Sequence, residues 1–180
     1  MKLLAELNDA NLLGMEGLSS ATPRRTARAV LQRADGLFAV MYVGRFGIHI
    51  LPGGGMDEGE SVEDTLRREI AEETGCVCRE ITPLGVVSEN RAHADYTVLS
   101  YYFYVRTDGP GAAPQLTPEE QHNGSQLQWH PLETLVHLIG DPVHEVWQRV
   151  FLQARDMAAL REYMSVAGIG EADDGSASAQ

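Results

Sequence analysis

The sequence GGGMDEGESVEDTLRREIAEETGC, which spans residues 53–76, sets our expectations for both the fold and the chemistry of this chain. Eight acidic residues lie between Asp57 and Glu73, against two arginines. Glu69, Glu72 and Glu73 are spaced i, i+3 and i+4, so on a helix their carboxylates share one face, about 5–6 Å apart. At an effective dielectric constant of 20, each like-charge pair at that distance costs about 3 kcal/mol. The spacing therefore predicts a positive group that neutralises this face.

The same stretch predicts a helix with marked ends. Apolar residues recur every four positions from Val62 to Ile70, with charged residues between them, which is the pattern of an amphipathic helix. Ser61, with Asp64 three residues later, makes a start that resembles a capping box. Gly75 can adopt the left-handed conformation that ends a helix. We therefore expect a helix that starts after Ser61 and stops at Gly75.

A run of three glycines, Gly53–Gly55, precedes this helix. Without a Cβ, the backbone at a glycine can approach an ion or a phosphate closely. Mg²⁺ and Mn²⁺ prefer carboxylate, carbonyl and water oxygens, and Mg²⁺ combines few protein ligands with substrate phosphates. Arg67 and Arg68 could neutralise part of the acidic face, but ion pairs with arginine would not require the glycines. Without the glycines, a solvated acidic surface would be the better interpretation. The combination indicates a divalent cation bridged to a phosphate ester or anhydride.

The identities in this stretch resemble the complete Nudix box. The matching positions are Gly54, Glu60, Arg68-Glu69-Ile70, Glu72-Glu73 and Gly75, with Cys76 where the family favours a bulky aliphatic residue. The similarity extends over about residues 23–160, through the flanking strand order and the segment Trp129-x-Pro131-Leu132. The resemblance implies an α/β fold, a Nudix α/β/α sandwich with a mixed central sheet, in which the box forms a loop–helix–loop.

The resemblance also implies a cofactor, Mg²⁺ or Mn²⁺, and roles for individual residues. Relatives hold the metal mainly through box glutamates, and in some of them a backbone carbonyl before the box glycine also binds. The implied metal ligands are Gly53, Glu69, Glu72 and Glu73. Arg68 matches the arginine that orients these carboxylates by charge-assisted hydrogen bonds, and Glu60 matches a glutamate of the same network.

The reaction that the resemblance implies is hydrolysis of a nucleoside diphosphate linked to another moiety, such as a nucleoside triphosphate or a nucleotide sugar. Water attacks a bridging phosphorus, the metal neutralises charge on the pyrophosphate, and a carboxylate takes the proton. Relatives recruit this base from the box or from a later loop. We predict Glu120, with Glu69 and Glu119 as alternatives. The predicted catalytic residues are Arg68, Glu69, Glu73 and Glu120.

Substrate contacts are predicted at Arg28, Arg45, Gly54 and Glu60. For Arg28, a solubilising cluster with Arg24 and Arg25 is the alternative interpretation. The partner that we expect is a small nucleotide or pyrophosphate, and the sequence leaves its identity open. Two other functions stay open as well. One is a non-catalytic nucleotide-binding sensor of the Nudix type, which need not keep the glutamates; the other is an isomerase, which needs a separate acid or thiol in its pocket.

The composition argues against several classes of protein. A length of 180 residues suits one domain. The net charge of −12, from 14 basic and 26 acidic residues, disfavours binding to nucleic acid. Apolar runs stay well short of the ~18 residues that a membrane span needs, and the N-terminal segment lacks the features of a signal peptide. Cys76 and Cys78 are too close for an easy disulfide, so we predict a reducing cytoplasm.

We divide the chain into an N-terminal extension (1–22), a Nudix hydrolase domain (23–164) and a disordered acidic tail (165–180). The strands that we predict are Thr26–Arg33, Leu37–Val43, Gly47–Leu51, Ile81–Val87, Tyr96–Thr107 and Gln126–His130, the first two as a hairpin. A long loop is predicted over 108–125, and further helices at Pro131–Ile139 and Pro142–Met164. The last helix has an apolar face, which is consistent with a homodimer.

Overall fold

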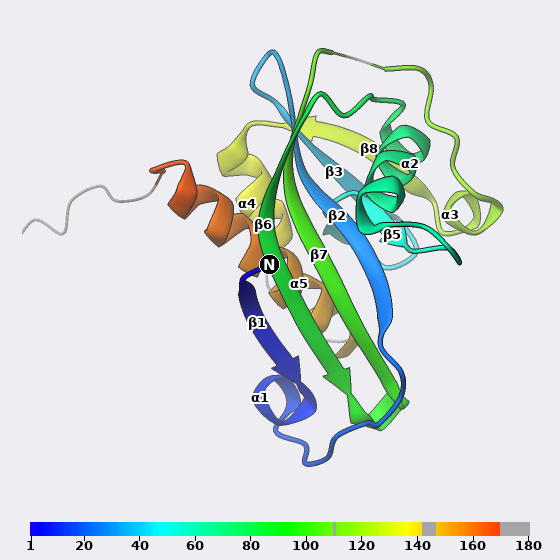
Figure 1. The fold of residues 1–180 in the computed structure, drawn as a ribbon, viewed down its shortest axis with the longest axis vertical. Coiled ribbons are helices and arrows are strands. Elements are labelled where there is room, and N and C mark those ends of the chain that lie inside the picture. Colours follow the sequence, from blue (N-terminus) through cyan, green and yellow to red (C-terminus); the bar gives the residue numbers. More distant parts are fainter. Residues whose placement is uncertain (110, 142–146, 170–180) are drawn as a thin grey trace, which may run out of the picture.

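The structure is a computed structural model, which describes residues 1–109, 111–141 and 147–169. The described residues form an eight-stranded mixed sheet flanked by helices (Figure 1). The strands are β1 (Leu3–Asn8), β2 (Arg24–Arg33), β3 (Phe38–Val43), β4 (Ile48–Ile50), β5 (Gly53–Gly55), β6 (Glu80–Arg91), β7 (Tyr96–Thr107) and β8 (Ser125–His130). The helices are α1 (Asp9–Leu13), α2 (Val62–Thr74), the 3-10 helix η1 (Ala92–Ala94), α3 (Pro118–His122), α4 (Leu132–Gly140) and α5 (Trp147–Val166).

Neighbouring strands follow the order β1-β6-β7-β2-β3-β4, with β5 paired to β2 and β8 paired to β3. The pairs β1–β6 and β2–β7 are parallel, and the pairs β2–β5, β3–β4, β3–β8 and β6–β7 are antiparallel. The predicted α/β class with a mixed central sheet is therefore confirmed.

Strands β2 and β3 form the predicted hairpin at the turn and then separate. Gln32 pairs with Phe38 beside the turn. Beyond this pair, β2 lies between β7 and β5, whereas β3 lies between β4 and β8. The sheet therefore opens between two sets of strands, and both sets line the cleft described below.

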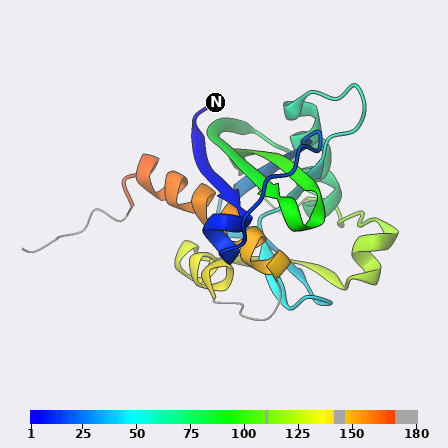
Figure 2. The same cartoon turned by 90° about the horizontal axis from the view of Figure 1, so that it is seen from below.

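Side chains of β2 alternate between two helical layers, because successive side chains of a strand point to opposite faces. Ala27 and Leu31 pack in a cluster with Leu66 and Ile70 of α2. Val30 packs on the other face, in a cluster with residues of α4 and α5. Figure 2 shows α2 on one side of the sheet and α4 and α5 on the other. This arrangement is the predicted sandwich.

Residues 1–22, which we assigned to an N-terminal extension, contribute a strand to the sheet. β1 pairs in parallel with β6, from Leu3 opposite Val86 to Asn8 opposite Asn90. The Lys2 ammonium also reaches α5, where it forms an exposed ion pair with Glu162 at 2.7 Å.

The predicted helix Pro142–Met164 corresponds to α5, which is described from Trp147 and ends at Val166. Residues 142–146 and the tail from residue 170 lie outside the described residues. Within the described part of the chain, every helix is too short or too polar to cross a membrane.

The loop predicted over residues 108–125 contains a helix, α3, so that prediction was wrong. Thr117 Oγ1 accepts a hydrogen bond from the backbone N–H of Glu120, and Pro118 occupies the first helical position. Thr-Pro-Glu-Glu is a helix-start pattern, with a capping threonine, a proline at the first position and a glutamate at the third. α3 lies beside β8, on the side of the molecule that carries the box (Figure 1).

Candidate active site

The three glycines of the box form β5, which lies antiparallel to β2. Gly53 pairs with Arg28, and Gly54 pairs with Ala27. Gly53 has a φ of +130°, which side chains rarely adopt, and a Cβ there would collide with the Ala27 carbonyl. A Cβ on Gly54 would lie 2.5 Å from the Glu69 carboxylate. The glycines therefore allow α2 to hold its carboxylates directly against β5.

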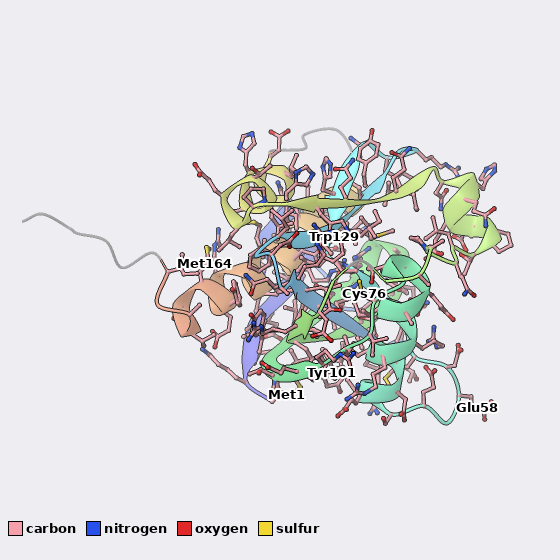
Figure 3. All side chains as sticks on the ribbon, turned by 90° about the horizontal axis from the view of Figure 1, so that it is seen from above. Met1, Glu58, Cys76, Tyr101, Trp129 and Met164 are labelled. Carbon is pink, nitrogen blue, oxygen red and sulfur yellow. The ribbon has the colours of Figure 1, made fainter. Side chains whose placement is uncertain are left out.

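Helix α2 begins and ends where the sequence predicts. Ser61 Oγ accepts from Asp64 N at 3.1 Å, and the Asp64 carboxylate accepts from Ser61 N at 3.2 Å. Gly75 ends the helix with a φ of +68°. In Figure 3, the loop that carries Glu58 projects from the molecule just before α2. Cys76 lies after the other end of α2, nearer the centre of the molecule. These fixed ends determine which helical positions face β5.

Glu73 lies at the floor of the site, with 6% of its surface exposed. Its Oε2 accepts a hydrogen bond from Gly53 N at 2.6 Å. Burial raises the pKa of Glu73 to about 8, against the opposing effects of the Arg28 charge and the Gly53 hydrogen bond. Burial also raises the pKa of Glu69, and there the Arg68 guanidinium opposes it. The two carboxyl groups thus lack enough nearby positive charge to offset their burial.

Arg68 connects the box loop to the box helix. Its Nε donates to Glu60 Oε1 at 2.7 Å, and its Nη2 donates to the Gly55 carbonyl at 2.9 Å. Its Nη1 donates to Glu69 Oε1 at 2.8 Å and to Glu72 Oε2 at 3.2 Å. The bonds from Arg68 hold the pKa of Glu60 down at about 2. The predicted orienting role of Arg68 and the membership of Glu60 in this network are consistent with these contacts.

The three glutamates differ in their surroundings although they share a helix face. Glu69 and Glu72 meet at the same Arg68 nitrogen, whereas Glu73 lies deeper, on the Gly53 amide. Among the described residues, no three carboxylate, imidazole or thiol groups converge closely enough to hold a metal ion in this arrangement. The donor set fits a hard divalent cation nevertheless, because it consists of carboxylates, two of them with raised pKa values, beside a glycine backbone.

A cleft of about 300 Å³ opens in front of Glu73, between the box and the β3–β4 side of the sheet. Its lining combines apolar and polar residues. The apolar residues are Met41, Val43, Phe46, Ile48, Ile50 and Leu152; the polar residues are Arg28, Thr117, Glu119, Glu120, Asn123 and Ser125. Gly53 and Gly54 complete the lining. The cleft can therefore accept a substrate that carries both polar and apolar groups.

The predicted substrate-binding arginines occupy different places. Arg28 lines the cleft, and its Nη1 donates to the Leu51 carbonyl at 3.0 Å. Its Nε is buried, and no described residue accepts a hydrogen bond from it. Arg45 is exposed and contacts two lining residues instead: it donates to Asn123 Oδ1 at 3.3 Å and lies over the Phe46 ring. Arg28 is thus in the cleft and Arg45 is at its rim.

The predicted general base Glu120 and its neighbour Glu119 both line the cleft from α3. Thr117 N and Oγ1 donate to Glu120 Oε2 at 2.7 and 2.9 Å, which closes the capping box. The negative charge of Glu120 also contributes to the raised pKa of Glu73. The structure therefore brings Glu120 to the cleft through a helix that the sequence interpretation missed.

Sequence reasoning also missed most of the cleft lining. Met41, Ile50 and Leu152 come from three separate elements, and no local pattern predicts that they meet. The sequence also did not lead us to predict that Thr117 and Asn123, which flank α3, line the cleft. The Thr-Pro-Glu-Glu pattern was the signal that could have located α3 and the lining residues that it carries.

Comparisons with known proteins agree with this geometry. A family model of the NUDIX domain matches residues 22–153. A curated relative from Bacillus subtilis (strain 168), named "Uncharacterized Nudix hydrolase YvcI", is 28% identical over 115 residues, which cover 64% of this chain and 70% of the relative.

Solved structures share the fold. A NUDIX hydrolase from Nitrosomonas europaea superposes with a TM-score of 0.61 at 19% identity, covering 81% of this chain and 90% of that one. A protein described as an ADP compounds hydrolase superposes with a TM-score of 0.59 at 23% identity, covering 83% of this chain and 77% of that one. Because the family model spans most of the sequence and includes the complete box, this chain belongs to the Nudix hydrolase family, whose members generally hydrolyse pyrophosphate bonds in small nucleotide-linked substrates.

Proposed function

We propose that this protein hydrolyses a pyrophosphate bond in a nucleoside diphosphate linked to another moiety, and that it depends on Mg²⁺ or Mn²⁺. The proposed metal ligands are the carboxylates of Glu69, Glu72 and Glu73 and the carbonyl of Gly53. Membership of the family supports the reaction class. The proposed metal and the proposed substrate class are inferred from the residues of the candidate site.

The observation that carries this proposal is the state of Glu73. Its carboxyl group is buried at the floor of an open cleft, on the Gly53 amide, with a pKa raised to about 8. A buried acid without a matching positive charge is unfavourable in its ionised form. A divalent cation bound beside Glu69 and Glu73 would supply that charge, and would neutralise the pyrophosphate oxygens of a bound substrate.

Two arginines orient the other groups. Arg68 fixes Glu69 and Glu72 from one side, so these carboxylates cannot rotate freely. Arg28 lines the cleft, and we propose that its guanidinium donates to a phosphate oxygen, for which this forked group is suited.

We propose Glu120 as the general base, with Glu69 and Glu119 as the alternatives. Thr117 orients Glu120 through Oε2, and we propose that Oε1 takes the proton of the attacking water. The Glu120→Gln variant should lose most of its rate, because the amide cannot accept that proton. A variant that keeps the full rate, with the acid limb of its pH–rate profile unshifted, excludes Glu120. The same measurement on Glu119→Gln and Glu69→Gln then tests the two alternatives.

The experiment measures phosphate and nucleotide release over a panel of nucleoside triphosphates, nucleotide sugars, ADP-ribose and dinucleoside polyphosphates, with Mg²⁺ or Mn²⁺. The Glu73→Gln variant should lower kcat by about 10²-fold or more through the loss of a metal ligand. The matched control is Glu63→Gln on the same helix, whose carboxylate is exposed and pairs with Arg67. We expect the control to retain the wild-type rate.

Turnover of a panel member by the wild type, lost in Glu73→Gln and kept in Glu63→Gln, supports the proposal. If nothing is hydrolysed while a nucleotide raises the melting temperature, the protein binds without turnover and the proposal fails. If Glu73→Gln turns over as fast as the control, the proposed metal site is wrong.

A further inference from the structure

A second group of charges is buried on the opposite face of the sheet from α2. It joins β6, β7 and α5 through Glu89, Arg91, Tyr102, Arg155 and Asp156. Each of these side chains is more than nine-tenths buried. The Glu89 carboxylate accepts from Arg91 Nε at 3.1 Å, and Arg155 Nη1 lies 3.9 Å from Glu89. Two acids face two arginines, so the group is close to electrically neutral.

Asp156 is the member of this group that reaches the segment leading into the box. Its Oδ1 accepts from Arg155 Nε at 2.9 Å and from the Tyr102 hydroxyl. Burial raises the pKa of Tyr102, so this hydroxyl stays a donor. Its Oδ2 accepts from the backbone N–H of Leu51 at 2.9 Å. Asp156 is fully buried, so the Leu51 bond is protected from competition by water.

Leu51 begins the three residues that lead into the proposed metal site. Its carbonyl accepts from Arg28 Nη1 at 3.0 Å, and the next carbonyl, that of Pro52, accepts from Ala29 N at 2.9 Å. Gly53 follows, and its N–H donates to Glu73. Asp156 therefore fixes the first peptide of a short segment that places the Arg28 guanidinium, the Gly53 carbonyl and the Glu73 carboxylate.

We propose that Asp156 is a positioning residue for the metal site. From the face of the sheet opposite α2, it holds the Leu51–Gly53 segment in place. This inference rests on the proposed function, because it assumes that Gly53 and Glu73 hold the metal. Asp156 lies on α5, three positions beyond the end of the matched NUDIX domain at residue 153. A purely structural role would stabilise α5 against the sheet without any effect on metal binding.

The test compares Asp156→Asn with Tyr102→Phe. In Asp156→Asn, the amide oxygen can still accept from Arg155 and Tyr102 at the Oδ1 position. The amide nitrogen then faces the Leu51 N–H, and because both groups are donors, that bond is lost. In Tyr102→Phe, a hydrogen bond to the other oxygen is lost and the Leu51 bond remains. Both variants disturb the buried group, and Asp156→Asn alone disturbs the segment. Mn²⁺ affinity is measured by the electron paramagnetic resonance signal of free Mn²⁺, and kcat and KM are measured on the best substrate.

We expect Asp156→Asn to weaken Mn²⁺ binding by about 10- to 100-fold, as for other groups that orient metal ligands. Its kcat should fall more than its KM rises, and Tyr102→Phe should keep Mn²⁺ affinity close to the wild type. If the wild type binds Mn²⁺ and folded Asp156→Asn binds it equally well, the inference is wrong and the proposed function stands. If the wild type binds no Mn²⁺, the proposed function itself fails.

A measurement on the unaltered protein keeps the inference testable if Asp156→Asn does not fold. Hydrogen exchange at the Leu51 amide should be as slow as that of the α5 core amides, because the bond to Asp156 is broken only when α5 leaves the sheet. Rapid exchange at Leu51, at the rate of exposed loop amides, would show that Asp156 does not hold the segment.

Discussion

Two charge clusters centred on arginines lie on opposite faces of the sheet, and they are built differently. Arg68 is 27% exposed, and its hydrogen-bond acceptors all lie within 13 residues of it in the sequence. Arg155 is buried, and its neighbour Asp156 bonds to groups 54 and 105 residues away. The first cluster is a local motif open to solvent and substrate, whereas the second is closed and joins distant parts of the chain. We expect the first to matter more for activity and the second more for stability.

The largest effect should come from removing one of the two cations of the closed cluster. Arg155→Met leaves Asp156 buried without its cation and Glu89 with Arg91 alone, and we expect the free energy of unfolding to fall by about 3–5 kcal/mol. Arg68→Met should cost less, about 1 kcal/mol, because water reaches two of the carboxylates that it leaves unpaired, those of Glu60 and Glu72, and only Glu69 is buried. Urea denaturation followed by circular dichroism measures both. Equal losses in the two variants would remove the distinction between the clusters.

A smaller effect, on activity, should come from a conservative change in the open cluster. Arg68→Lys keeps the charge but replaces a forked guanidinium, which bonds to both sides of the box, with a single ammonium group. We expect kcat to fall by about 10- to 100-fold, with little change in the free energy of unfolding. Arg67→Lys, at an exposed position next to it, is the control. If both lysine variants have wild-type kcat, the geometry of the open cluster does not matter for catalysis.

The smallest effect, taken per pH unit, is the pH dependence of stability in the metal-free protein. Burial raises the pKa of Glu73 from 4.5 to about 8, so between these values the folded state holds a proton that the unfolded state releases. The free energy of unfolding should therefore fall as the pH rises through this window, by at most about 1.4 kcal/mol per pH unit. Glu73→Gln should flatten the slope. Urea denaturation in the presence of a chelator measures both proteins.

The same titration predicts proton release on metal binding. Below a pH of about 8, a cation that binds to Glu73 must displace its proton, so about one proton should be released per ion. Calorimetry in buffers of different ionisation enthalpy measures that number. A slope that persists unchanged in Glu73→Gln, together with no proton release, would show that Glu73 is already ionised in the folded protein.

The parts of the molecule that the sequence predicts are those with short-range causes. Ser61, Asp64 and Gly75 set the ends of α2 through contacts within a few residues, and the structure agrees at both ends. Alternation of polar and apolar residues located most strands, although β6 continues beyond the predicted end at Val87 to Arg91. Its last residues include Glu89 and Arg91, whose polar side chains are buried against α5, and such residues hide the strand from a hydrophobicity pattern.

The parts that escaped prediction depend on contacts between distant residues. The separation of β2 from β3 follows from their other partners, β5, β7, β4 and β8, and no residue of the turn encodes it. The bond between Gly53 and Glu73 spans 20 residues, and the bond between Leu51 and Asp156 spans 105. The box spacing therefore predicted the glutamates and Arg68 of the candidate site, and the folded chain was needed to find what supports them and what lines the cleft. The roles of those residues in metal binding and catalysis stay predictions.

The position of Asp156 on α5 has a consequence for protein engineering. A shortened form designed from the matched domain would stop at residue 153 and would lose the partner of the Leu51 amide. It would also expose the core that Leu160 and Tyr163 fill from the same helix. The minimal unit for crystallisation, library selection or fusion to another protein should therefore extend at least to Tyr163, ten residues beyond the boundary that sequence alignment suggests.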